Sequence, residues 1–130
     1  MPSSGGLVLA WLPAVVWAVL IFVLYAQPDL RFVPDAGLDF VVRKVGHMGI
    51  FGILALLLWR AAAISGWPRP WAWAIALTIL YAITDELHQG IVGGRTQAVV
   101  DVGFDAAGAL IAIVAGRTLR SRRRRRDLGS

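Results

Sequence analysis

The sequence predicts an all-α membrane protein: a small transmembrane four-helix bundle with both termini in the cytoplasm. Of its 130 residues, 58% are hydrophobic and only 16% are charged, whereas soluble domains are about 45–50% apolar. The mean hydropathy is +0.67. Most of the charged residues stand in short clusters between or after long apolar stretches. A water-soluble fold would need more charge to cover its surface, so we expect one transmembrane domain over residues 1–116.

The first predicted span covers residues 7–25, which form an uncharged run of apolar residues. A bilayer core of about 30 Å needs about 20 such residues in a helix. Pro13 falls within the first two turns and is expected to kink the helix. The alternative is a cleaved signal peptide, which has a basic start and an apolar core of about 7–15 residues. No Lys or Arg precedes Arg31 and the run is longer, so the pattern favours a span.

The second and third predicted spans cover residues 45–64 and 71–89, after a mixed connection at 26–44 in which Asp39 is expected near an N-cap. The second span carries glycine at every third position from Gly46 to Gly52, a spacing that lets another helix approach closely. The segment between the two spans, SGWPRP, has the Gly and Pro content of a tight turn. The two spans are therefore expected to form a hairpin.

The fourth predicted span covers residues 97–116, with Thr96 as its N-cap. Gly108, Ala112 and Gly116 recur every four residues along it and form a ridge of small side chains. Residues 117–130 follow as a basic cytoplasmic tail, predicted to be disordered.

Charge distribution predicts the orientation and the partners. Nine of the thirteen basic residues lie in the tail or flank the turn at 65–70, and four lie in the two other connections. Because basic residues stay in the cytoplasm, both termini should be cytoplasmic. The net charge is +5, but a basic tail beside an apolar helix contacts anionic lipid more often than DNA. We therefore expect membrane lipids as partners, and no nucleic acid. The chain has no cysteine, which excludes disulfides and thiolate metal sites.

In this topology, polar side chains from three spans converge on the outer face of the membrane. Helical spacing places them in stripes, since residues three or four apart share a face. An ionised carboxylate at membrane depth costs at least about 2.5–3.5 kcal/mol unless it meets a partner or water. Asp105 is the deepest and most needs a basic partner. The candidate ligand-binding cluster comprises Lys44, His47, Asp85, Glu86, Gln89, Arg95, Asp101 and Asp105.

These residues also resemble the pattern of the VanZ-like family over about residues 44–116. That pattern places Lys and His at the head of one helix, then D-E-x-x-Q, an Arg-Thr loop, and D-x-x-x-[ND]-x-x-G. Its elements here are Lys44 and His47; Asp85, Glu86 and Gln89; Arg95 and Thr96; and Asp101, Asp105 and Gly108. Two positions differ: Gly90 stands where an aromatic residue is common, and Asp105 where Asn is common.

The resemblance implies a multi-pass protein of the bacterial plasma membrane. The founding member of the family is linked to low-level resistance to the glycopeptide teicoplanin, and many members lie outside resistance clusters. The resemblance does not identify a ligand or a reaction. No cofactor or metal is predicted, and the oligomeric state is left open.

Four functions compete. The favoured one is binding or modulation of a cell-envelope lipid, precursor or amphiphilic glycopeptide, with Lys44, His47 and Arg95 facing an anion and the carboxylates orienting these bases. The second is an enzyme acting on a lipid-linked substrate, in which carboxylates hold a hard divalent metal and His47 or Glu86 serves as general base. No H-E-x-x-H, P-loop or nucleophile-elbow motif supports it. The third is transport or proton coupling, and the fourth is a purely structural role in an assembly.

Overall fold

Four helices make up the protein, and the computed structural model describes them over residues 2–25, 33–93 and 99–129. They are α1 (Ser4–Tyr25), α2 (Ala36–Ile64), α3 (Pro70–Gly93) and α4 (Val99–Gly129). These ranges contain no strand, so the predicted all-α class is confirmed. The expected N-cap Thr96 lies outside the described residues.

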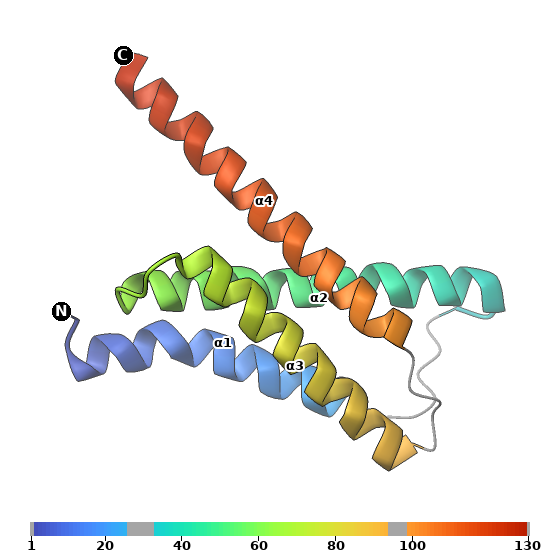
Figure 1. The fold of residues 1–130 in the computed structure, drawn as a ribbon. Helices are drawn as coiled ribbons and strands as arrows, with labels where there is room; N and C mark the ends of the chain where they lie inside the picture. The colour runs from blue at the N-terminus through green and yellow to red at the C-terminus, as the bar shows by residue number, and fades with distance from the viewer. Residues whose placement is uncertain (1, 26–32, 94–98, 130) are drawn as a thin grey trace.

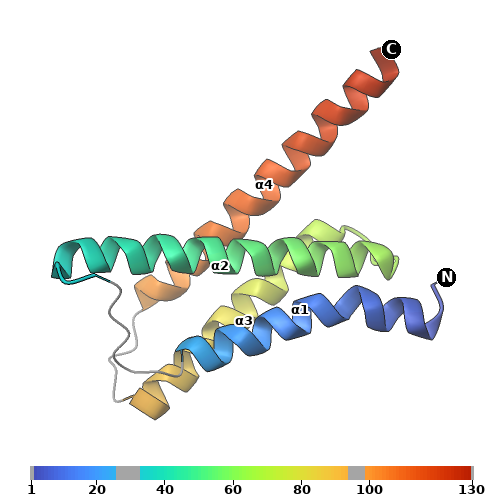
Figure 2. The same cartoon turned by 180° about the vertical axis from the view of Figure 1, so that it is seen from behind.

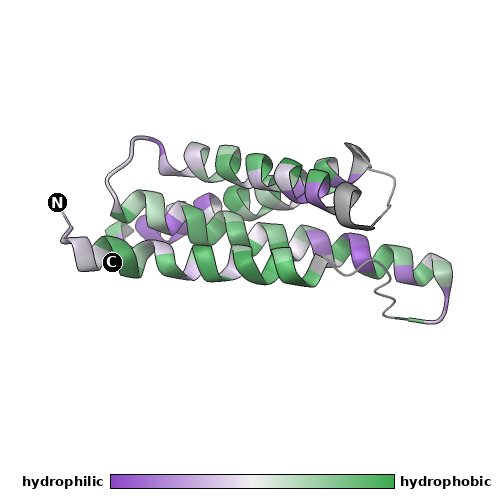
Figure 3. Cartoon of the chain, turned by 90° about the horizontal axis from the view of Figure 1, so that it is seen from below, coloured by the Kyte–Doolittle hydropathy of each residue, from purple (hydrophilic) through white to green (hydrophobic). Residues whose placement is uncertain are grey.

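Three of the four helices are long and apolar enough to cross a membrane, namely Ser4–Leu24, Ala36–Ile64 and Asp101–Gly129. Hydrophobic residues recur along the helices, as Figure 3 shows, and many large ones are exposed, among them Leu9 at 67% and Val45 at 62%. Such a surface suits lipid and not water. Helix α3 is not among the three, because Asp85 and Glu86 lie within it. The third predicted span therefore stays a prediction.

Helices α2 and α4 are longer than the sequence predicts. Helix α2 begins nine residues early because Asp35, and not Asp39, is its N-cap, with its Oδ1 accepting a hydrogen bond from the backbone N–H of Leu38 at 2.9 Å. Helix α4 continues to Gly129, so the prediction of a disordered tail at 117–130 is wrong over the described residues. Arginine is a good helix former, and no Gly or Pro interrupts residues 117–128.

Helix α2 is the centre of the bundle and packs against each of the other three helices. Helices α3 and α4 cross it obliquely on the same side, and α1 runs along it (Figures 1 and 2). Helix α1 has little contact with α3 and relies on α2 for its packing. Both termini and the turn between α2 and α3 lie toward one end of the bundle, and the C-terminal part of α4 leaves the other helices (Figure 1).

Helices α2 and α4 approach each other closely where the predicted ridge of small residues lies. A Cβ atom added to Gly108 would lie 2.2 Å from the backbone oxygen of Met48, and one added to Gly116 would lie 2.7 Å from the Trp59 ring. On α2, Gly52 faces this ridge, whereas Gly46 and Gly49 have open space beside them. Glycine therefore permits backbone contact between these helices.

Hydrogen bonds between side chains and backbone carbonyls join α1 to α2 and α3. The indole N–H of Trp17 donates to the carbonyl oxygen of Ile50 in α2 at 2.9 Å. The hydroxyl of Tyr81 in α3 donates to the carbonyl oxygen of Ala18. Toward the other end, Arg60 donates to the carbonyl oxygen of Ala10 at 3.2 Å. These contacts compensate for the limited packing of α1 against α3.

Candidate polar site at the end opposite the termini

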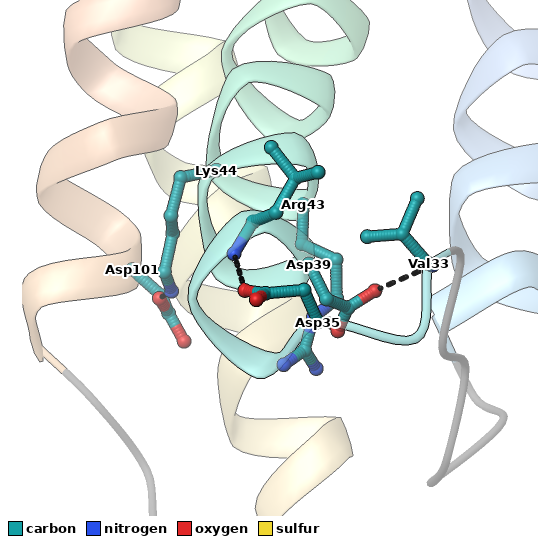
Figure 4. A network of polar contacts seen from close by, with 7 residues as sticks. Val33, Asp35, Asp39, Arg43, Lys44 and Asp101 are labelled. Carbon is teal, nitrogen blue, oxygen red and sulfur yellow. Dashed lines mark hydrogen bonds and ion pairs between the residues drawn. The ribbon is translucent and has the colours of Figure 1, made fainter.

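Two acid–base pairs join α2 to α4 at the end opposite the termini. The Nζ of Lys44 forms an ion pair with Asp101, and the Nδ1 of His47 lies 3.0 Å from the Oδ1 of Asp105. Within each helix the partners are about one turn apart, so the pairs lie one above the other. Figure 4 shows Lys44 reaching across to Asp101. His47 is thus the base that the deep carboxylate of Asp105 meets.

Aromatic rings hold the Lys44 ammonium in place. It lies 5.2 Å from the ring centroid of Phe40, one turn earlier in α2, and 5.6 Å from that of Phe104 in α4. Its side chain is only 19% exposed, and that of Asp101 18%. A cation between rings in a poorly solvated position gains more from each ring than it would in water. Lys44 is therefore fixed between α2 and α4.

Helix α3 carries two carboxylates, of which that of Glu86 acts electrostatically on Asp105. Asp85 is 3% exposed, and its carboxylate acts electrostatically on Tyr81, one turn earlier in the same helix. Asp105 is in the electrostatic field of His47, Lys44 and Glu86. Asp105 of α4 is therefore close enough to charged groups of α2 and α3 for their charges to act on it.

A third ion pair involves residues that were not among the predicted site residues. Asp39 is 1% exposed, its Oδ2 lies 3.0 Å from the Nε of Arg43, and its Oδ1 accepts the backbone N–H of Val33 at 3.3 Å (Figure 4). The pair was missed because residues 26–44 were interpreted as a connection. The spacing of four residues between Asp39 and Arg43 is the sequence signal for this pair, because oppositely charged side chains four residues apart meet on the face of a helix.

Six of the eight predicted site residues lie in the described part of the chain, and four of them form the two pairs between α2 and α4. The remaining two, Arg95 and the side chain of Gln89, lie outside the described part of the chain. Within the described residues, no group of three His, Cys, Asp or Glu side chains is arranged to hold a metal ion. In the same ranges this end carries more carboxylates than permanent cations: Asp35, Asp39, Asp85, Glu86, Asp101 and Asp105 against Arg43 and Lys44.

An apolar groove lies between α1 and α3. It has a volume of about 350 Å³, and Leu54 and Leu58 of α2 contribute to its lining. Tyr81 and Thr84 also line it, and Thr84 directly precedes Asp85. One turn further along α3, the ring of His88 contacts that of Phe22 in α1, with 4.1 Å between centroids. The groove thus extends along the apolar part of the bundle to the level of the carboxylates.

Comparison with known proteins identifies the family of this chain. The family model described as VanZ/LLP1 matches residues 7–120, a region that includes most of all four helices and every predicted site residue. Neither a search of curated proteins nor a search of solved structures gave a match. Since the family model spans most of the sequence, and the acid–base pairs between α2 and α4 lie within it, the chain belongs to the VanZ/LLP1 family.

Proposed function

We propose that this protein binds an amphiphilic cell-envelope molecule, a lipid or a glycopeptide-related compound, in a bacterial plasma membrane. Its termini are cytoplasmic, and its polar cluster lies in the outer leaflet. The observation that supports this best is the apolar groove of about 350 Å³, whose lining includes Thr84, the residue before the buried Asp85. A groove open to lipid accepts a hydrocarbon chain, while the cluster accepts the polar group to which the chain is joined.

The chemistry of the cluster favours a headgroup with hydrogen-bond donors. Lys44 and His47 are already engaged by Asp101 and Asp105, so they are less suited to an anion than the sequence suggests. An ionised carboxylate has about four acceptor positions, so Glu86 can accept further bonds in addition to its present interactions. Sugar hydroxyls and amines are the donors that carboxylates bind. An amine or a polyol in the headgroup therefore fits this end of the bundle.

The test is native mass spectrometry of the purified protein with its co-purifying lipids. Val15→Trp fills the groove, since Val15 lines it and is 55% exposed, and Val19→Trp is the matched control on the outer surface of α1, also 55% exposed. Glu86→Gln removes a charge from the cluster, and Asp127→Asn removes one from the far end of α4. We expect one lipid species to be lost from Val15→Trp and Glu86→Gln and kept in both controls. A wild type without a selectively bound species, or equal losses in all variants, contradicts the proposal.

A second function is supported by the two pairs between α2 and α4. Paired charges at membrane depth fasten helices together, so the cluster also fits a structural protein that presents a rigid surface to an assembly. Crosslinking in intact membranes separates the two functions. A constant protein partner that persists in Glu86→Gln, together with no selective lipid, supports assembly; a selective lipid without such a partner supports amphiphile binding.

A further inference from the structure

A second polar region lies at the other end of the bundle, where α4 changes from apolar to basic within one turn. Val114 is 61% exposed on the apolar part of α4, and Arg117 follows three residues later. Arg117 is sixteen residues beyond Asp101, which is about 24 Å along a helix. The basic region is therefore separated from the carboxylate cluster by most of the thickness of a bilayer.

Two of these arginines are held by stacking on tryptophan. The guanidinium of Arg117 lies 4.4 Å from the ring centroid of Trp71 in α3, and that of Arg120 lies 4.6 Å from that of Trp59 in α2. Stacking occupies the face of a guanidinium and leaves the N–H groups at its edge available. A fork of N–H donors held in this way suits the oxygens of a phosphate.

Further arginines extend this arrangement into two hollows on the surface of α4. The first has a volume of about 270 Å³ and is lined by Trp59, Arg117, Arg120, Ser121 and Arg124. The second, of about 450 Å³, is lined by Val114, Arg117, Thr118, Ser121, Arg122 and Arg125. Each hollow thus combines three guanidinium groups with a hydroxyl and, on one side, with an apolar or indole surface. That mixture matches a phosphate joined to a hydrocarbon chain.

Charge repulsion within the helix also favours a bound anion. Seven arginines fall within residues 117–126, and Asp127 is the one acidic residue that follows them. Like charges three or four residues apart destabilise a helix by a few tenths of a kcal/mol per pair, roughly as much as opposite charges stabilise it. We propose that the hollows on α4 bind the phosphates of anionic phospholipids in the leaflet next to the α4 C-terminus. The bound phosphates offset this repulsion and keep the basic part of α4 helical.

Matched pairs of arginines make this proposal testable. Arg120→Gln/Arg124→Gln removes two donors from the first hollow, whereas Arg123→Gln/Arg126→Gln removes the same charge from two arginines that line neither hollow. The full-length variants are purified, and phosphatidylglycerol and phosphatidylcholine are titrated into each with native mass spectrometry as readout. Size-exclusion chromatography shows that each variant is folded. A parallel titration adds inorganic phosphate as competitor.

We expect the first double variant to bind phosphatidylglycerol about thirtyfold more weakly than the wild type, because two arginines that contribute about 1 kcal/mol each amount to about 2 kcal/mol. The second should lose less than threefold, and inorganic phosphate should not displace the lipid. Equal losses in the two variants would show that only net charge matters and would overturn the site. Displacement by inorganic phosphate would overturn the assignment to lipid. Neither result bears on the groove between α1 and α3.

Discussion

Replacing Gly108 with alanine tests whether close contact between α2 and α4 holds the bundle together. The new methyl carbon would lie 2.2 Å from the backbone oxygen of Met48 and 2.7 Å from its Cα. Neither atom belongs to a flexible side chain, so the helices must separate by about 1 Å to reach an ordinary van der Waals distance. Overpacking of this kind costs typically about 1–3 kcal/mol.

The separation would also reach the polar cluster. His47 immediately precedes Met48, and Asp105 lies three residues before Gly108. The 3.0 Å contact between the His47 and Asp105 side chains therefore lengthens when the helices move apart. A hydrogen bond between membrane helices is worth about 0.6 kcal/mol on average. We expect Gly108→Ala to lower the free energy of unfolding by about 1–3 kcal/mol in total, mainly through the backbone contact.

Gly103→Ala is the matched control, because it lies on the same helix and a Cβ atom there has nothing within 4 Å. Both variants gain the same helix propensity, up to about 1 kcal/mol, so their difference isolates the packing contribution. The assay is reversible unfolding in mixed micelles with increasing sodium dodecyl sulfate, followed by far-ultraviolet circular dichroism. A Gly108→Ala protein as stable as Gly103→Ala would refute the close approach of the two helices.

Three other changes probe the remaining contacts. Tyr81→Phe removes the hydroxyl that donates to the Ala18 carbonyl, and we expect a loss of about 0.6 kcal/mol in the same unfolding assay. Trp17→Phe removes an indole N–H from a comparable interhelical bond, so it should lower the free energy of unfolding by a similar amount. In the double variant Tyr81→Phe/Trp17→Phe, limited proteolysis should cut α1 before it cuts the rest of the bundle. Lys44→Met should lower the free energy of unfolding more than the double variant Lys44→Met/Asp101→Leu does, because the single change leaves a poorly solvated carboxylate without its cation. Equal losses of unfolding free energy in the two variants would mean that the pair contributes nothing to stability.

Hydropathy and turn composition predict the four helices but not their ends. Uncharged runs define the apolar segments, and SGWPRP defines the turn between α2 and α3, where Gly66 has a φ of +76°. The start of α2 was misplaced because its first two turns contain charged residues. The end of α4 was misplaced because a run of arginines has the composition of a disordered tail, while its helix propensity is high. Composition predicts disorder there and helix propensity predicts a helix, and the structure contains the helix.

That Lys44 and His47 share one face of α2, and Asp101 and Asp105 one face of α4, could be predicted from their helical spacing. The pairing could not, because the crossing of α2 and α4 decides it. Gly108 lets the helices come close enough for His47 to reach Asp105, and Phe104 orients Lys44 toward Asp101. The groove between α1 and α3 is equally invisible in the sequence, because it depends on how little these two helices touch.

The modest hydropathy of α3 has a consequence for how the protein is made. Helix α1 is apolar enough to leave the translocon and enter the bilayer alone, whereas α3 is not among the helices that meet the requirement. The turn between α2 and α3 is short, with Ser65 capping the end of one helix and Pro70 beginning the next. During synthesis α3 is therefore expected to insert together with α2, as a helical hairpin. The carboxylates of α3 are then shielded from lipid only after α4 has been made and has packed against the hairpin.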